Sequence, residues 1–254
     1  MKEHRRLVEG IAAKLAYDYC CYRGNLFGES YLSASVGEII QSLHGGKNAV
    51  VVSGVKHKIL AEIQTGGGRR PEIDFVVQTY DDSSDTKRAR TKGSLKEISD
   101  YKLVATAVET KWADSSHCSI ANVIWDLIRL ELLVNKNPDM NAVLLIAGTT
   151  RAMNKLQGEL GSIVSFARGP SRIDLLSKDI PTQKKLAKLL SDKAIADLEM
   201  PRAVQVDVLQ SSLNTVNPSK MSAILWKVSC VGARNTFKPK DIPEYIAPPK
   251  KPKN

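Results

Sequence analysis

Three charged side chains on two neighbouring predicted strands are of the types that metal-assisted chemistry needs. Glu109 and Lys111 lie two positions apart in the apolar, β-branched stretch VATAVETKW, and Asp74 lies in the earlier stretch EIDFVVQ. Because side chains alternate across a strand, Glu109 and Lys111 project from the same face, together with Ala107. An acid on one strand and this pair on the next can converge at one edge of a sheet. The pattern predicts a site where two carboxylates bind a divalent cation beside a lysine.

The chemistry that suits this set is hydrolysis of a phosphodiester. The reaction needs an activated water and neutralisation of the charge that develops on the phosphate oxygens, and a divalent cation supplies much of both. Mg²⁺ prefers oxygen ligands and commonly takes one or two carboxylates, so Asp74 and Glu109 are the expected ligands. Lys111 is expected to contact the scissile phosphate or to orient and deprotonate the water. Burial lowers the pKa of a lysine and carboxylates raise it, so the sequence leaves both roles open.

Bulk composition indicates a globular protein with a polyanionic partner. The chain has 254 residues, 37 Lys or Arg and 27 Asp or Glu, and its formal net charge is +10. Such an excess favours nucleic acid as a partner, with good solubility as the plainer interpretation. The four cysteines lack the spacing of a zinc site and are expected to be reduced thiols in a cytoplasmic protein. We expect no secretory signal and no membrane span.

The elements around the candidate residues alternate between strand and helix. Helices are predicted at 2–22, 34–43, 118–134, 153–160 and 182–197. Strands are predicted at 49–52, 72–78, 103–112, 141–148, 172–176, 203–209 and 223–230. Ser33 and the turn at 114–116 are the expected N-caps of the second and third helices. The stretch 141–148 is entirely apolar, which is typical of a strand covered on both faces.

Two short motifs resemble those of a known enzyme superfamily. The tetrapeptide PEID at 71–74, followed by ETK at 109–111, resembles the PD-(D/E)xK nucleases, the fold of many restriction endonucleases. The resemblance covers about residues 33–150. It implies an α/β, restriction-endonuclease-like core, in which helices flank a central mixed β-sheet. The acid then lies on a hairpin strand and Glu-x-Lys on the next, followed by a helix and a further core strand.

The resemblance also implies roles for further residues. Glu38 matches a catalytic glutamate that many members carry on a helix before the first acid. The backbone carbonyl of Thr110 is implied as a metal ligand beside Asp74 and Glu109. One polar residue on the following helix is expected to assist, and the candidates are Asn122, Asp126 and Arg129.

The literal Pro-Asp pair of the family is absent, because two residues separate Pro71 from Asp74. Glu72 is therefore an alternative to Asp74 as the metal ligand. Ile73 and Phe75 are both expected to face the core, which favours Asp74.

These features predict a Mg²⁺-dependent endonuclease that hydrolyses DNA, and Mn²⁺ is expected to be able to replace Mg²⁺. A restriction or phage-defence enzyme is one kind of endonuclease that fits this prediction. Double-stranded DNA is the expected partner, and a homodimer is one expected assembly. The expected contacts to the nucleic-acid backbone are Arg69, Arg70, Lys87, Arg88, Arg90 and Lys92. The alternatives are a non-catalytic nucleic-acid-binding module and an assembly protein that keeps the fold and docks a partner on helix 182–197.

A single nuclease-like domain is predicted over residues 1–240. Its core is expected at about 33–150, with 151–240 as a C-terminal elaboration. Residues 241–254 are rich in Pro and Lys and are predicted to form a tail.

Overall fold

The computed structural model describes the chain in segments: residues 2–44, 49–57, 72–79, 97–98, 104–160, 164, 166–176, 184, 187–188, 190–191, 198–212, 220–232 and 235–242. The helices are α1 (Lys2–Cys20), α2 (Glu29–His44), α5 (Ile120–Lys136) and α6 (Thr150–Leu160), with short 3-10 turns η1 (Gly24–Leu26) and η3 (Pro239–Asp241). The strands are β1 (Ala49–His57), β2 (Glu72–Thr79), β3 (Glu97–Ile98), β4 (Val104–Trp112), β5 (Asn141–Thr149), β6 (Gly169–Asp174), β7 (Met200–Pro201), β8 (Ala203–Gln210), β9 (Met221–Ser229) and β10 (Thr236–Phe237).

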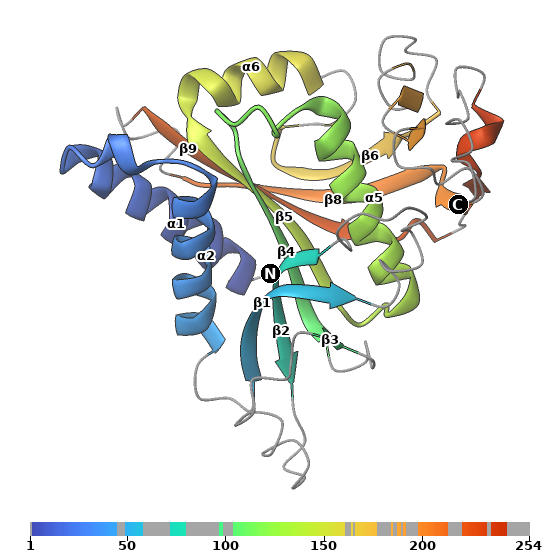
Figure 1. Cartoon of the computed structure of the whole chain (residues 1–254), viewed down its shortest axis with the longest axis horizontal. Helices are drawn as coiled ribbons and strands as arrows, with labels where there is room; N and C mark the ends of the chain where they lie inside the picture. Colours follow the sequence, from blue (N-terminus) through green and yellow to red (C-terminus); the bar gives the residue numbers. More distant parts are fainter. Residues whose placement is uncertain are drawn as a thin grey trace, which may run out of the picture.

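The main sheet is mixed and runs in the order β3-β1-β2-β4-β5-β9-β8-β6, with helices on both faces (Figure 1). The pairs β4–β5 and β1–β3 are parallel, and the other neighbours are antiparallel. β7 and β10 form a separate two-stranded sheet. The prediction of an α/β fold with a central mixed sheet flanked by helices is confirmed. The strands after residue 150 extend this sheet. β9 pairs with β5 along its length, β8 pairs with β9, and β6 pairs with β8.

β5 separates two hydrophobic cores. Leu144 and Ile146 face the core beneath α5 and α6, whereas Val143 and Leu145 face the core beneath α1 and α2. All four side chains are fully buried. The apolar stretch at 141–148 is thus covered on both faces, as its composition predicted.

Two predicted helix starts are wrong. α2 begins at Glu29 rather than after Ser33, because the fully buried Leu32 and Val36 already form its packed stripe and the Leu32 N–H bonds to Gly28. The N-cap of α5 is Ser119 rather than the turn at 114–116, since the Ser119 hydroxyl accepts the N–H of Asn122 at 3.4 Å.

Most of the predicted helix 182–197, and all of the predicted tail after residue 242, lie outside the described residues. In the part of the chain that is described, no helix is long and apolar enough to cross a membrane.

Candidate functional site

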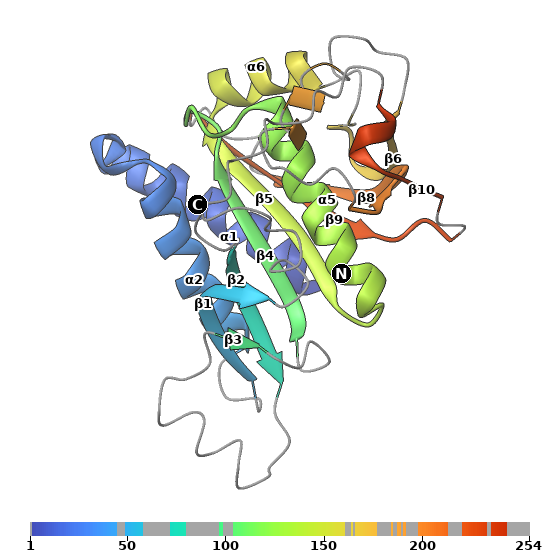
Figure 2. The same cartoon turned by 45° about the vertical axis from the view of Figure 1, so that its right-hand side comes forward.

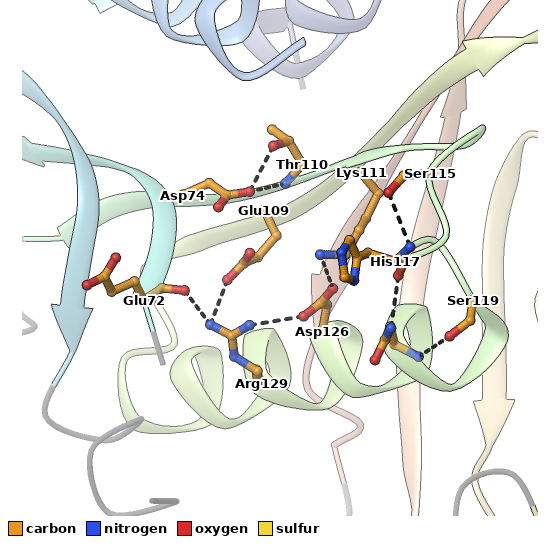
Figure 3. Close-up of polar contacts among 11 residues, drawn as sticks. Glu72, Asp74, Glu109, Thr110, Lys111, Ser115, His117, Ser119, Asp126 and Arg129 are labelled. Carbon is orange, nitrogen blue, oxygen red and sulfur yellow. Dashed lines mark hydrogen bonds and ion pairs between the residues drawn. The ribbon is translucent and has the colours of Figure 1, made fainter. Parts of the chain in front are cut away.

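Asp74 lies where β2 and β4 separate. The ladder between the two strands ends at the pair Phe75–Val108. One residue further on, Oδ2 of Asp74 accepts both the backbone N–H and the hydroxyl of Thr110, each at 2.8 Å (Figure 3). Thr110 is buried, so this carboxylate satisfies donors that would otherwise lack a partner. The structure thus holds the Asp74 carboxylate against the strand that carries Glu109 and Lys111.

The flanking residues of Asp74 are both buried, as expected, but in different cores. Ile73 lies in the core beneath α5, and Phe75 lies in the core beneath α1 and α2. Residues two apart on a regular strand share a face. The alternation of β2 is therefore interrupted at Asp74, at the point where its ladder with β4 ends.

Glu109 and Lys111 project from the same face of β4, as predicted, and both meet α5. Glu109 is only 2% exposed, and its Oε1 lies 2.9 Å from Nη2 of Arg129. Nζ of Lys111 lies 3.1 Å from Oδ2 of Asp126. Glu109 and Lys111, two positions apart on β4, thus pair with Arg129 and Asp126. These two partners are three positions apart on α5 and therefore lie on one face of the helix.

Arg129 joins three elements of the site. Its Nη1 donates to Oδ1 of Asp126 at 3.0 Å, and its Nη2 donates to the backbone carbonyl of Glu72 on β2 as well as contacting Glu109. Figure 3 shows the guanidinium of Arg129 reaching from α5 toward both strands. In formal charges, Glu109 and Asp126 balance Lys111 and Arg129, and Asp74 adds one further negative charge.

Burial and neighbouring charges shift the protonation of the site. Burial raises the pKa of Glu109 well above its ordinary value, against the opposing effect of Arg129 and with further help from Asp126 and Asp74. For Lys111, burial lowers the pKa, but Asp126 and Glu109 more than offset it, so the pKa lies above its ordinary value. Lys111 is therefore an ammonium at neutral pH, which favours a contact to phosphate over proton abstraction from water.

Glu38 is not brought to this group. Its side chain is 72% exposed on α2, which packs on the opposite face of the sheet from α5, and it pairs with Lys14 at 3.8 Å. No hydrogen bond or ion pair in the described part of the chain joins Glu38 to Asp74, Glu109 or Lys111. The predicted backbone-binding residues lie outside the described segments: Arg69, Arg70, Lys87, Arg88, Arg90 and Lys92.

Of the three polar candidates on the helix after β4, two reach the site. Asp126 and Arg129 do so, whereas the amide of Asn122 donates to the carbonyl of His117 in the loop before α5.

Cys118 was not identified as a site residue from the sequence. Its thiol is buried, and the charges of Lys111 and Asp126 both act on its pKa. Burial raises the pKa of this thiol to about 12. The sequence carries no signal for Cys118, because its position depends on how α5 docks on the sheet.

The site contains oxygen atoms of the types that a hard divalent cation prefers. The carboxylates of Asp74 and Glu109 and the carbonyl of Thr110 are ligand types that Mg²⁺ accepts, with waters completing its shell. Among the described residues, no group of three or more His, Cys, Asp and Glu side chains is arranged to hold a metal. Of the three carboxylates in the site, Asp126 is paired with Lys111 and Arg129, and Asp74 and Glu109 are the two candidate ligands. Both hydrogen bonds to Asp74 use Oδ2, and Arg129 provides a positive charge at Glu109.

Comparisons of the chain with protein-family models, with curated proteins and with solved structures found no match.

Proposed function

We propose that this chain is a Mg²⁺-dependent endonuclease with a restriction-endonuclease-like core, which hydrolyses phosphodiester bonds of DNA and accepts Mn²⁺ in place of Mg²⁺. The observation that carries the proposal is the convergence of Asp74 with Glu109 and Lys111 at the separation of β2 and β4. A restriction or phage-defence role, double-stranded DNA as the substrate and a homodimer as the assembly belong to the same proposal.

The order of elements supports it. β2 carries the acid and pairs antiparallel with β4, which carries Glu-x-Lys. α5 follows, and β5 then lies parallel to β4. This is the arrangement that the resemblance to PD-(D/E)xK nucleases implies.

Each residue has a defined task in the proposed reaction. Asp74, Glu109 and the carbonyl of Thr110 would hold the cation, which supplies an activated water and neutralises charge on the phosphate. Lys111, kept as an ammonium, contacts an oxygen of the scissile phosphate and stabilises the charge that develops there. Asp126 fixes the position of that ammonium at 3.1 Å.

The test is cleavage of supercoiled plasmid and linear duplex DNA with Mg²⁺, with Mn²⁺ and with EDTA. Lys111→Ala and Glu109→Ala are each expected to reduce the rate by about 10²-fold or more, because transition-state charge loses its stabilisation. Lys155→Ala is the matched control, since this exposed lysine on α6 lies outside the site. Cleavage that persists in both site variants would refute the proposal, and discrete fragments would indicate sequence-specific cutting.

One observation favours a second candidate, a non-catalytic DNA-binding module. Glu109 is buried and already paired with Arg129, so its charge is compensated without a metal. Such a module would retain duplex DNA with a strong dependence on salt concentration and would give no metal-dependent product. The same set of assays, with binding measured beside cleavage, separates the two candidates.

A further inference from the structure

The contact between Arg129 and Glu109 is an ion pair without a hydrogen bond. Nη2 of Arg129 lies 2.9 Å from Oε1 of Glu109, yet this buried oxygen accepts no hydrogen bond within the described part of the chain. The hydrogen bonds of the guanidinium go elsewhere, from Nη1 to Oδ1 of Asp126 and from Nη2 to the carbonyl of Glu72. Charge alone therefore holds the carboxylate of Glu109 to Arg129.

Arg129 is held in place independently of Glu109. Its side chain is buried on α5, which lies along the face of the sheet opposite the one that α1 and α2 cover (Figures 1 and 2). Asp126 anchors the guanidinium to its own helix, and the carbonyl of Glu72 anchors it to β2. Neither hydrogen bond uses Glu109, so the guanidinium can keep its position when the carboxylate of Glu109 takes another charge partner.

A divalent cation bound by Asp74 and Glu109 would lie close to this fixed positive charge. Figure 3 shows the Glu109 carboxylate between the Asp74 carboxylate and the Arg129 guanidinium. The side chain of Glu109 is 2% exposed, so little water screens the charges around it. Like charges repel more strongly in such surroundings than in bulk water. The guanidinium of Arg129 therefore opposes the binding of a cation at Glu109.

The same guanidinium is needed when no cation is bound. Among the described residues, Arg129 is the one cation within ion-pair distance of Glu109, because Lys111 pairs with Asp126 instead. A buried carboxylate that loses its partner is strongly destabilising. Stability of the cation-free chain and affinity for the cation therefore make opposite demands on this position.

We propose that Arg129 is the resident counter-charge of Glu109, which stabilises the cation-free chain and lowers the affinity of the site for a divalent cation. This inference rests on the proposed function, because it takes Asp74 and Glu109 as the cation ligands. In the opposing role, Arg129 would orient Glu109 for the cation, as outer partners of metal ligands commonly do. The two roles predict opposite effects of removing the guanidinium, tighter binding in the first and weaker binding in the second.

The test is calorimetric titration of the full chain with Mn²⁺ at pH 8 in the absence of DNA. Arg129→Met and Arg129→Gln should each bind Mn²⁺ about tenfold more tightly than the wild type, because a repelling charge is removed. Arg129→Met/Glu109→Gln should lose this gain, since the carboxylate that benefits is absent. Arg151→Met, which removes an exposed arginine on α6, is the matched control and should bind as the wild type does.

The melting temperature gives a second readout. A cation that binds only the folded chain raises it by mass action. Mn²⁺ should therefore raise the melting temperature of Arg129→Met more than that of the wild type or of Arg129→Met/Glu109→Gln. Arg129→Gln decides the test if Arg129→Met does not fold, because its amide can still donate to Asp126 or to the carbonyl of Glu72.

Each result separates this inference from the proposed function. If the Arg129 variants bind Mn²⁺ no more tightly than the wild type, or if Arg129→Met/Glu109→Gln binds as tightly as Arg129→Met, the inference is overturned, while metal-dependent cleavage by the wild type still supports the nuclease. If no protein in the set binds Mn²⁺, both proposals fall. Tighter binding in the Arg129 variants, with no cleavage by the wild type, would support the inference and refute the nuclease.

Discussion

Replacement of Arg129 by methionine tests the electrostatics of the site most directly. Methionine keeps an apolar stem of similar length, so the change removes chiefly the guanidinium and its contacts. Those contacts are the ion pairs to Glu109 at 2.9 Å and to Asp126 at 3.0 Å, and the hydrogen bond to the carbonyl of Glu72. Asp126 keeps Lys111 as a partner at 3.1 Å. In the described part of the chain, Arg129 is the one cation within ion-pair distance of Glu109.

The expected loss follows from the burial of Glu109. Removing one partner of a buried ion pair costs about 3–5 kcal/mol, because the remaining charge is left uncompensated. The pKa of Glu109 in the folded chain lies above its unfolded value near 4.5, so folding is most favoured where the group is protonated. The free-energy penalty of folding with an ionised Glu109 therefore grows as the pH rises from about 4.5 to the pKa of Glu109 in the folded chain. Without Arg129 that pKa rises further, so Arg129→Met should cost more at pH 8 than at pH 5.

Urea unfolding at pH 5 and pH 8 measures both effects. Arg129→Met/Glu109→Gln should recover much of the stability at pH 8, because the uncompensated charge is gone. Arg151→Met, on an exposed arginine of α6, is the control and should stay within about 0.5 kcal/mol of the wild type. The reasoning is refuted if Arg129→Met lies within about 1 kcal/mol of the wild type at pH 8, or if Glu109→Gln restores nothing.

Two further predictions concern packing and reactivity. Gly148→Ala should lower the free energy of unfolding by about 1–3 kcal/mol, because an added Cβ would lie 2.7 Å from the Cβ of Ala113. Gly158→Ala should be neutral or stabilising, because an added Cβ there meets no atom from elsewhere in the described part of the chain within 4 Å. Equal melting temperatures for the two variants would contradict this. Cys118 should resist alkylation of the native chain at pH 8, since its pKa is about 12, while the exposed Cys20 and Cys21 react. Peptide mapping after labelling checks this order, and modification of Cys118 as fast as the exposed thiols would show that the packing around β4 is looser than described.

Local patterns in the sequence predicted much of the sheet. Period-two alternation put Glu109 and Lys111 on one face of β4, and the apolar run at 141–148 indicated a strand buried on both faces. Both features depend only on the backbone geometry of a strand, which is the same in any fold. Helix starts were harder to predict: Ser33 has the right side chain for a cap, but burial of Leu32 extends α2 to Glu29.

The sequence by itself determined which residues can take part in metal-assisted chemistry, and that Glu109 and Lys111 share one face of their strand. Both conclusions follow from residue types and from alternation along a short stretch of chain. Only the tertiary structure decided their partners. Arg129 reaches Glu109 and Glu72 because α5, which packs on β5 and β9, directs this side chain toward β4 and β2. Glu38 faces Lys14 because α2 packs on the other face of the sheet. Such contacts join residues that are tens of positions apart, and long-range packing rather than local propensity brings them together. The protonation of Lys111 follows from the same packing, since it reflects burial and the charges that the docked helix supplies.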